Sequence, residues 1–237
     1  MIRVPTGVKG LDEMLGGGLP KERVVIVYGG SGTGKTIFSL QFLASAAERG
    51  VHGIYVNLET PIKSVKENIE SFGWNISEKE KNKLIRLLDY NTLHPARLPK
   101  NNVKYKDPVQ AIINEITDSE KSIGAKLLVI DPLACLTIHE QGASVKRRRI
   151  VELFNYLRSG SYTALLTSGM VPSVSEYYIE DVLADGIIKL DKVINNFNLI
   201  RTIRIEKMRG VKHDEQPRRY VIDEKGFTVY NTEPVKL

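Results

Sequence analysis

The eight residues Gly29-Gly-Ser-Gly-Thr-Gly-Lys-Thr36 decide how this chain of 237 residues folds. They satisfy the pattern G-x-x-x-x-G-K-[ST] and follow Val24-Val-Ile-Val-Tyr28, an apolar run typical of a buried strand. Residues 35–49, which come next, have the apolar spacing of a helix. A loop of this pattern between a strand and a helix is a P-loop, a turn that binds phosphate groups.

The predicted P-loop carries the chemistry of a nucleotide site. Its glycines let successive backbone N–H groups converge on phosphate oxygens, and the following helix points its positive dipole end at the same anion. Lys35 adds a charge toward the β- and γ-phosphates, and the Thr36 hydroxyl can bind Mg²⁺, which takes few protein ligands. The predicted ligands are therefore ATP and Mg²⁺. The predicted nucleotide-binding residues are Gly29, Gly30, Ser31, Gly32, Thr33, Gly34, Lys35, Thr36, Phe38 and Asp131.

Outward from the P-loop, short apolar runs typical of buried parallel strands alternate with helical patterns. Helices are expected to begin at Thr60, which a proline follows, at Asp107, which also precedes a proline, and at Ser144. This alternation predicts an α/β fold with a mainly parallel central sheet. The apolar runs after the P-loop are 53–58, 126–130 and 162–168.

The last fifty or so residues follow a different pattern. From about Gly186, strand-like runs succeed one another without helical spacers, and Asn195-Asn196 provides a turn, which predicts an antiparallel β meander. The polar stretch 89–107 is either a functional insertion or a mobile loop. We interpret residues 1–237 as one domain, made of a lead-in segment 1–22, an α/β core 23–185 and the meander 186–237.

The composition excludes several classes of protein. Hydrophobic residues make up 42% and charged residues 26%, which are globular values and not those of a disordered chain. The single cysteine, Cys135, excludes an internal disulfide and a cysteine-based metal cluster. No apolar run approaches the roughly 18 residues of a membrane helix, so we expect a cytoplasmic protein with no membrane partner. The net charge of +6 favours a polyanionic partner, a nucleotide or a nucleic acid, without requiring one.

Two carboxylates are expected at the same edge of the sheet as the P-loop. Asp131 ends an apolar run, the place of a Walker-B aspartate, which binds the Mg²⁺ shell from a strand beside the P-loop strand. Glu59 ends another run, where a carboxylate can orient or deprotonate the water that attacks the γ-phosphate. The alternatives are a turn-starting role for Asp131 and a helix-capping role for Glu59.

Two cations of the meander share one face of a predicted strand. Lys207 and Arg209 are two residues apart, so both side chains point the same way. They either belong to the solvated face of an edge strand or reach a γ-phosphate held by a neighbouring subunit. The denser basic run 146–149 surrounds its helix, which favours a solvated face or a subunit salt bridge over a stripe for nucleic acid.

Several motifs together resemble the KaiC-like branch of the RecA superfamily of ATPases, and the resemblance covers nearly the whole chain. Besides the P-loop, these motifs are Thr6-Gly-Val-Lys-Gly-Leu-Asp-Glu-Met-Leu-Gly-Gly-Gly-Leu-Pro20, Phe38-Ser-Leu-Gln-Phe-Leu43, Tyr55-Val-Asn-Leu-Glu-Thr-Pro61, Ser71-Phe-Gly-Trp74 and Lys207-Met-Arg-Gly-Val-Lys-His213. The last is similar to the family's K-x-R-x-x-x-H element. The resemblance implies a RecA-like core and ATP bound between subunits of a homo-oligomer.

The resemblance also implies roles for individual residues. Glu59 is then the general base, Asp131 the Walker-B acid, and Lys207 and Arg209 contact the nucleotide of the adjacent subunit. With Lys35, this makes Glu59, Lys207 and Arg209 the predicted catalytic residues. The predicted metal ligands are Thr36 and Asp131.

The chain departs from the family pattern at two places. Thr60 follows Glu59, where the family often has a second acid. Asp181 and Val182 stand where the autophosphorylating domain of the circadian clock protein has a Ser-Thr pair, so autokinase activity is not expected.

These observations predict a slowly hydrolysing ATPase that forms a ring of six subunits and acts in regulation or signalling, with an unidentified protein partner. One alternative is a DNA-binding accessory ATPase of recombination or repair, in which loops 132–143 and 169–178 contact DNA. Those loops contain no Lys or Arg, and only Tyr177 and Tyr178 are suited to stack on bases. The other alternative is a nucleotide-gated scaffold without catalysis.

Overall fold

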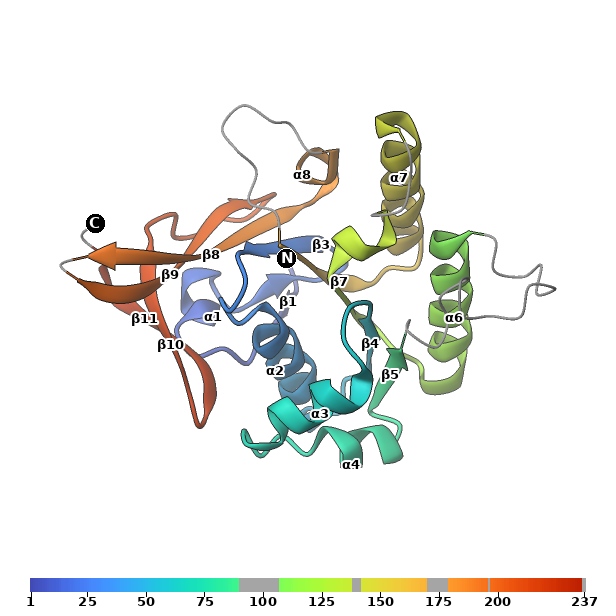
Figure 1. Cartoon of the computed structure of the whole chain (residues 1–237), viewed down its shortest axis with the longest axis horizontal. Coiled ribbons are helices and arrows are strands. Elements are labelled where there is room, and N and C mark those ends of the chain that lie inside the picture. Colours follow the sequence, from blue (N-terminus) through green and yellow to red (C-terminus); the bar gives the residue numbers. More distant parts are fainter. Residues whose placement is uncertain (90–106, 138–141, 170–178, 196, 236–237) are drawn as a thin grey trace.

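The computed structural model describes residues 1–89, 107–137, 142–169, 179–195 and 197–235. Its centre is a nine-stranded sheet in the order β11-β10-β9-β8-β3-β7-β6-β4-β5 (Figure 1). The strands are β3 (Val24–Gly29), β4 (Gly53–Asn57), β5 (Ile85–Asp89), β6 (Leu127–Asp131), β7 (Thr163–Ser168), β8 (Gly186–Asn195), β9 (Asn198–Met208), β10 (Arg218–Asp223) and β11 (Gly226–Pro234). Two short strands, β1 (Arg3–Val4) and β2 (Leu19–Pro20), form a separate antiparallel pair.

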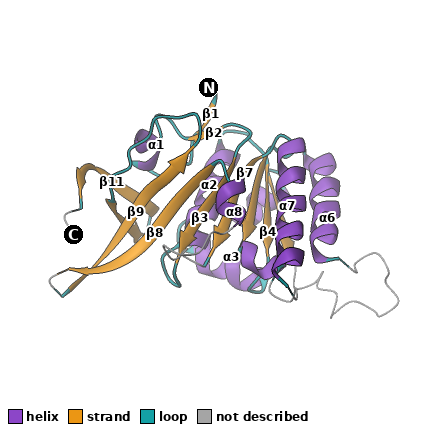
Figure 2. Ribbon diagram, turned by 90° about the horizontal axis from the view of Figure 1, so that it is seen from above, coloured by secondary structure: helices purple, strands orange, loops and turns teal. Residues whose placement is uncertain are grey.

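Helices cover both faces of the sheet, and a separate apolar core fills each side. On one face the core contains side chains of α2, α3 and α4, and on the other those of α6 and α7. The view from above in Figure 2 shows α6 and α7 at the side away from the long β8–β9 hairpin. The helices are α1 (Leu11–Met14), α2 (Lys35–Glu48), α3 (Ile62–Glu70), α4 (Ile76–Lys81), α6 (Pro108–Ile123), α7 (Ala143–Ser159) and α8 (Ile179–Leu183), with a 3₁₀ helix at Leu133–Leu136.

The predicted fold class is confirmed. Strands β3 to β8 pair in parallel and form the part of the sheet that ends at β5, and their apolar runs are covered on both faces, as is usual for parallel strands. Strands β8 to β11 pair with one another in antiparallel order, as the meander pattern predicts. The meander is not a separate layer, however: β8 pairs with β3 and continues the central sheet.

The predicted helix starts were right in one case out of three. Asp107 caps α6, with its carboxylate accepting hydrogen bonds from the backbone N–H groups of residues 109 and 110. Thr60 is not the cap of α3; the helix begins after Pro61, and the Ile62 N–H donates to the Asp89 carboxylate at 3.3 Å. The cap thus comes from β5, a strand that sequence patterns did not predict. Ser144 lies inside α7, and Gly142 precedes that helix.

The lead-in segment is tied to the last strand through α2. The Gln41 side-chain amide donates from its Nε2 to the Gly7 carbonyl oxygen at 2.9 Å, and its Oε1 accepts from the Phe227 N–H at 2.6 Å. The first and last parts of the chain therefore meet on the helix that follows the P-loop. Among the described residues, no helix combines the length and the apolar character needed to cross a membrane.

Candidate functional site

The P-loop connects β3 to α2, and side chains of β10 pack against it. Gly34 has φ +93°, and a Cβ there would collide with the Ile222 side chain, so the position requires glycine. The Tyr220 hydroxyl donates to the Thr33 carbonyl oxygen at 2.7 Å, and the Thr33 hydroxyl donates to the Gly30 carbonyl oxygen at 2.8 Å. The loop conformation is thus fixed by this chain's own contacts.

Lys35 extends back along the loop. Its ammonium donates to the carbonyl oxygens of Gly29 at 2.7 Å and Gly30 at 3.1 Å. Burial lowers the pKa of Lys35, the negative charges of Asp131 and Glu59 oppose that effect, and the positive charge of Lys192 adds to it. The ammonium therefore lies at the mouth of the loop in an environment that a bound phosphate would improve.

Asp131 is the acceptor at the centre of the site. It is only 5% exposed, and its Oδ2 accepts from the Thr36 hydroxyl at 2.7 Å and from the Tyr55 hydroxyl at 2.6 Å. Its Oδ1 accepts from the Thr167 hydroxyl. The expectation that its strand lies beside the P-loop strand was wrong, since β7 lies between β3 and β6. The first turn of α2 still brings Thr36 to Asp131.

The donor set fits Mg²⁺. A threonine hydroxyl and a buried carboxylate oxygen lie next to each other at the end of the P-loop, and Mg²⁺ uses few protein oxygens because it keeps much of its water shell. Thr36 and Asp131, the metal ligands expected from the sequence, are the residues that would hold the ion.

Tyr55 and Thr167 were missed by sequence reasoning. Both are buried. Tyr55 is in β4 and Thr167 is in β7, the two strands that pair with β6, so their hydroxyls reach the Asp131 carboxylate. Burial, and next the charge of Asp131, raise the pKa of Tyr55 well above its usual value, which keeps the phenol protonated as a donor. Strand alternation is the signal that places such side chains on one face, but it does not reveal which strands are neighbours.

Glu59 lies just beyond β4, at the same sheet edge. Asn57 of β4 is level with Asp131 of β6, so Glu59, two residues further on, lies just past the end of the strands, next to Asp131. Its side chain is exposed, and its charge acts on Lys35, Tyr55 and Cys135. The P-loop, Asp131 and Glu59 are therefore gathered at one edge, as predicted.

Lys207 and Arg209 are not part of this group within one subunit. Lys207 is level with Ile187, which is level with Ile26, three residues before the P-loop. At about 3.3 Å per residue this is about 10 Å along the strands, and two strands away. The Lys207 ammonium donates to the carbonyl oxygens of Asp181 and Ala184, each at 2.7 Å, on the face that carries α7 and α8.

Arg209 is bound to the same segment. Its guanidinium donates to the Val182 carbonyl oxygen at 2.9 Å and lies 3.9 Å from the Asp185 carboxylate. Burial, and next the charge of Arg209, lower the pKa of Lys207. Both cations are thus held against the carboxyl end of α8, away from the P-loop of their own chain.

Residues 4–234 match the family model described as the KaiC ATPase. The chain belongs to the KaiC ATPase family. A UPF0273 protein of Aeropyrum pernix is 34% identical over 242 residues, which cover 99% of this chain and 96% of that protein. The circadian clock protein KaiC2 of Synechocystis is 29% identical over 231 residues, which cover 97% of this chain but 40% of KaiC2.

A solved structure is also similar to this KaiC-family chain. The crystal structure of a KaiC-like protein from Pyrococcus horikoshii aligns with a TM-score of 0.84 at 32% identity, covering 97% of this chain and 99% of that chain. The resemblance stated from the motifs is therefore confirmed, as is the α/β fold class.

Two further predictions from the sequence, Phe38 and the basic run 146–149, can be located in the structure. Phe38 is fully buried and packs edge-on against Phe227 at 5.5 Å, so its side chain belongs to the core and not to the loop surface. In the basic run, Arg149 pairs with Asp107 and, at 3.3 Å, with Glu152. Residues 90–106, 138–141 and 170–178, which include most of the polar stretch and parts of the two loops considered for DNA, lie outside the described residues.

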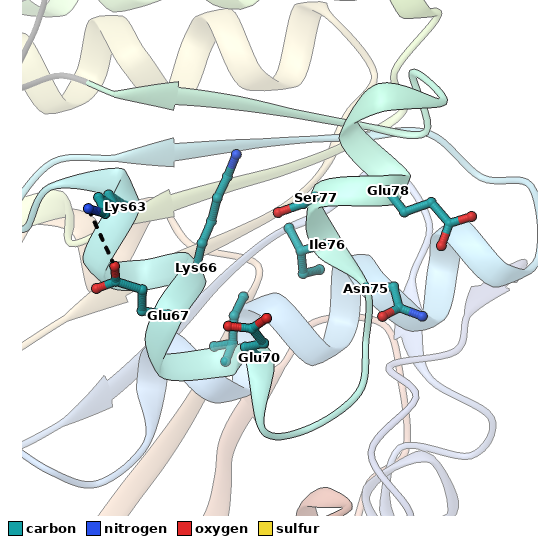
Figure 3. Close-up of a pocket in the computed structure, with 9 residues that line it drawn as sticks. Lys63, Lys66, Glu67, Glu70, Asn75, Ile76, Ser77 and Glu78 are labelled. Atoms are coloured by element: carbon teal, nitrogen blue, oxygen red, sulfur yellow. Dashed lines mark ion pairs between the residues drawn. The ribbon is translucent and has the colours of Figure 1, made fainter.

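A hollow of about 450 Å³ lies between α3 and α4 (Figure 3), and no P-loop residue lines it. Its charged lining residues are Lys63, Lys66, Glu67, Glu70 and Glu78, and Figure 3 shows the Lys63–Glu67 ion pair of 3.8 Å. Lys66 pairs with Glu80 at 2.6 Å. Because glutamates outnumber lysines around this hollow, it does not suit a polyanion, and we assign the nucleotide to the P-loop.

Proposed function

We propose that this chain is an ATPase that binds ATP·Mg²⁺ at its P-loop and hydrolyses it slowly in a ring homo-oligomer of six subunits, where each nucleotide lies between neighbours. The observation that carries the proposal is the convergence of Lys35, Thr36, Asp131 and Glu59 at one sheet edge while Lys207 and Arg209 face away from it. A single subunit then has the binding groups and lacks two of the cations.

Each group has a distinct role in this proposal. The P-loop N–H groups and Lys35 bind the phosphates, and Thr36 and Asp131 would hold Mg²⁺, which supplies charge neutralisation when bound. Glu59 orients the attacking water and accepts its proton. Tyr55 and Thr167 position the Asp131 carboxylate by donating to its two oxygens.

Slow hydrolysis follows from where the remaining cations lie. Lys207 and Arg209 would stabilise the γ-phosphoryl transition state of the adjacent subunit, the role of an arginine finger supplied in trans. To do so they have to exchange the carbonyl oxygens at the end of α8 for phosphate oxygens. Turnover therefore depends on how subunits are placed against one another, which supports a regulatory role; the relative KaiC2 is named a circadian clock protein.

An exposed apolar surface supports contact between subunits. The tip of the β8–β9 hairpin carries Phe197, which is fully exposed, with Ile194 and Leu199 more than half exposed. Figure 2 shows this hairpin projecting from the body of the molecule. The hairpin runs past the P-loop end of β3, so a neighbouring subunit that covers its apolar tip would also approach the nucleotide.

Mixed oligomers of two inactive variants test the arrangement. Glu59→Gln removes the base, and Lys207→Ala removes the cation supplied to the neighbouring subunit. We therefore expect each variant alone to hydrolyse ATP far more slowly than the parent. After subunit exchange, some interfaces combine an intact Glu59 from one subunit with an intact Lys207 from the other, and ATPase activity should return to roughly a quarter of the parent's for random pairing.

The outcome separates the two arrangements of the site. If Lys207 served the nucleotide of its own subunit, mixing would restore nothing, because no subunit would hold both groups. Light scattering with and without ATP provides the matching control, since the proposal requires an assembly under the assay conditions. A parent protein that hydrolyses ATP while remaining monomeric in its presence would contradict the proposal.

A further inference from the structure

A second lysine lies against the P-loop, and no P-loop motif contains it. The Lys192 ammonium donates a hydrogen bond to the Ser31 carbonyl oxygen at 3.0 Å. A Cβ on Gly32 would lie 2.7 Å from the same nitrogen, so the ammonium lies directly beside the exposed middle of the loop. Lys192 therefore shares the phosphate-binding turn with Lys35, although it comes from a different strand.

The sheet dictates this placement. β8 runs parallel to β3, and Leu190 is level with Gly29, so the residues after Leu190 pass alongside the loop. Side chains alternate along a strand, and Leu190 faces the core on the α2 side. Lys192 consequently points to the side of the sheet on which the loop enters α2.

The surroundings of Lys192 are positively charged. Its direct cross-strand partner is Arg201, and like charges in that position are unfavourable. The Arg201 Nε is buried and has no hydrogen-bond partner within the described part of the chain. The charge of Lys192 also lowers the pKa of Lys35, which places both ammonium groups in one electrostatic environment. A polyanion at the loop would relieve these repulsions.

We propose that Lys192 binds the phosphate groups of the nucleotide held by its own subunit, exchanging the Ser31 carbonyl oxygen for phosphate oxygens. This inference rests on the proposed ATP site and adds to it a residue from the β8–β9 hairpin. Lysine suits the task because its long flexible stem lets the ammonium move between the two acceptors. A bond from an ammonium to an ionised phosphate is stronger than one to a neutral carbonyl, so the exchange is favourable.

Calorimetric titration of Lys192→Ala with ATP and with ADP, in the presence of Mg²⁺, tests the proposal. We expect ATP to bind about tenfold more weakly, equal to about 1.4 kcal/mol. Lys192→Arg should recover most of the affinity. Lys225→Ala is the matched control, because it also removes an exposed lysine charge, here from the turn between β10 and β11, and its affinity should equal the parent's.

The pattern of losses decides the contact. With an unchanged melting temperature, a loss confined to ATP indicates the γ-phosphate and a loss shared by ADP indicates the β-phosphate, and both support the proposal. Affinities within twofold of the parent for both nucleotides would overturn it. An equal loss for both nucleotides together with a lower melting temperature would also overturn it, since Lys192 would then only hold the loop.

A mixture with Lys35→Ala subunits shows which chain supplies the ammonium. Those subunits have an intact Lys192 and a disabled P-loop, so they can help a neighbour but not themselves. We expect the mixture to keep the weak affinity of Lys192→Ala, and recovery of parental affinity would overturn the assignment to the same subunit. A parent protein that binds no ATP would remove the proposed function itself, whereas normal parental binding with an unaffected Lys192→Ala would remove only this inference.

Discussion

Two pairs of cations lie on opposite faces of the central sheet, and their surroundings differ. Lys35 and Lys192 donate hydrogen bonds to carbonyl oxygens of the P-loop itself, on the face that carries α2. Lys207 and Arg209 are bound by carbonyl oxygens of residues 181, 182 and 184, on the face that carries α8. The first pair surrounds a turn built for an anion, and the second pair holds a helix end.

The difference separates binding from catalysis. The groups that bind phosphate are assembled inside one chain, so nucleotide affinity should depend on that chain alone. The second pair stabilises its own subunit until another molecule offers a stronger acceptor, which an ionised phosphate is. Changes on the α2 face should therefore alter affinity, and changes on the α8 face should alter turnover.

Replacing Lys35 by alanine is expected to have the largest effect. The substitution removes the ammonium that bridges the two ends of the loop, and we expect ATP affinity to fall on the order of 10²-fold or more. Titration with a fluorescent ATP analogue measures it, with Lys225→Ala as the control of equal charge change. Affinity retained by Lys35→Ala would show that the nucleotide lies elsewhere.

Lys207→Ala or Arg209→Ala should give the opposite pattern. Each removes a cation expected at the neighbour's γ-phosphate, so we expect turnover to fall on the order of 10²-fold while ATP affinity stays within about twofold. Steady-state phosphate release and equilibrium binding, measured on the same preparations, separate the two effects. Turnover equal to the parent's in both variants would leave these residues only their structural role at α8.

The sequence predicted the P-loop edge well because each of its residues directly follows a local pattern that is easy to recognise. An apolar strand followed by glycines, or by an acid, places Lys35, Asp131 and Glu59 at the carboxyl end of a parallel sheet, since all such strands point the same way. What the sequence did not reveal was strand order. Inserting β7 between β3 and β6 is what brings the Thr167 hydroxyl to Asp131, and no local pattern encodes that neighbour.

Contacts between distant segments were missed for the same reason. Lys192 was read only as part of a strand, and the register of β8 on β3 decides that its side chain reaches Ser31. The α3 cap was assigned to Thr60 because the competing acceptor, Asp89, belongs to β5, a short strand in a largely polar stretch. Phe38 was included among the nucleotide-binding residues, yet its side chain is fully buried in the core.

A smaller effect is expected from Tyr55→Phe. The substitution removes one donor to Asp131 and leaves Thr36 and Thr167, so the carboxylate is held less firmly and the Mg²⁺ concentration needed for half-maximal ATP binding should rise about threefold to tenfold. Tyr28→Phe is the matched control, because that buried tyrosine donates to Asp181 of α8 at 2.5 Å. Its Mg²⁺ requirement should not change. An equal shift in both variants would mean a general loss of packing.

The smallest effect is a proton taken up when ATP binds at alkaline pH. The pKa of Lys35 is lowered from 10.5, first by burial, so between that lowered value and 10.5 part of the free protein carries neutral Lys35. Bound phosphate favours the charged form and draws in a proton, so affinity should fall as the pH rises through this window. Calorimetry in two buffers of different ionisation enthalpy, about one pH unit below 10.5, counts the protons. Lys192→Ala should reduce the proton uptake, because removing that positive charge raises the pKa of Lys35 in the free protein. An unchanged uptake would show that the charge of Lys192 does not influence the protonation of Lys35.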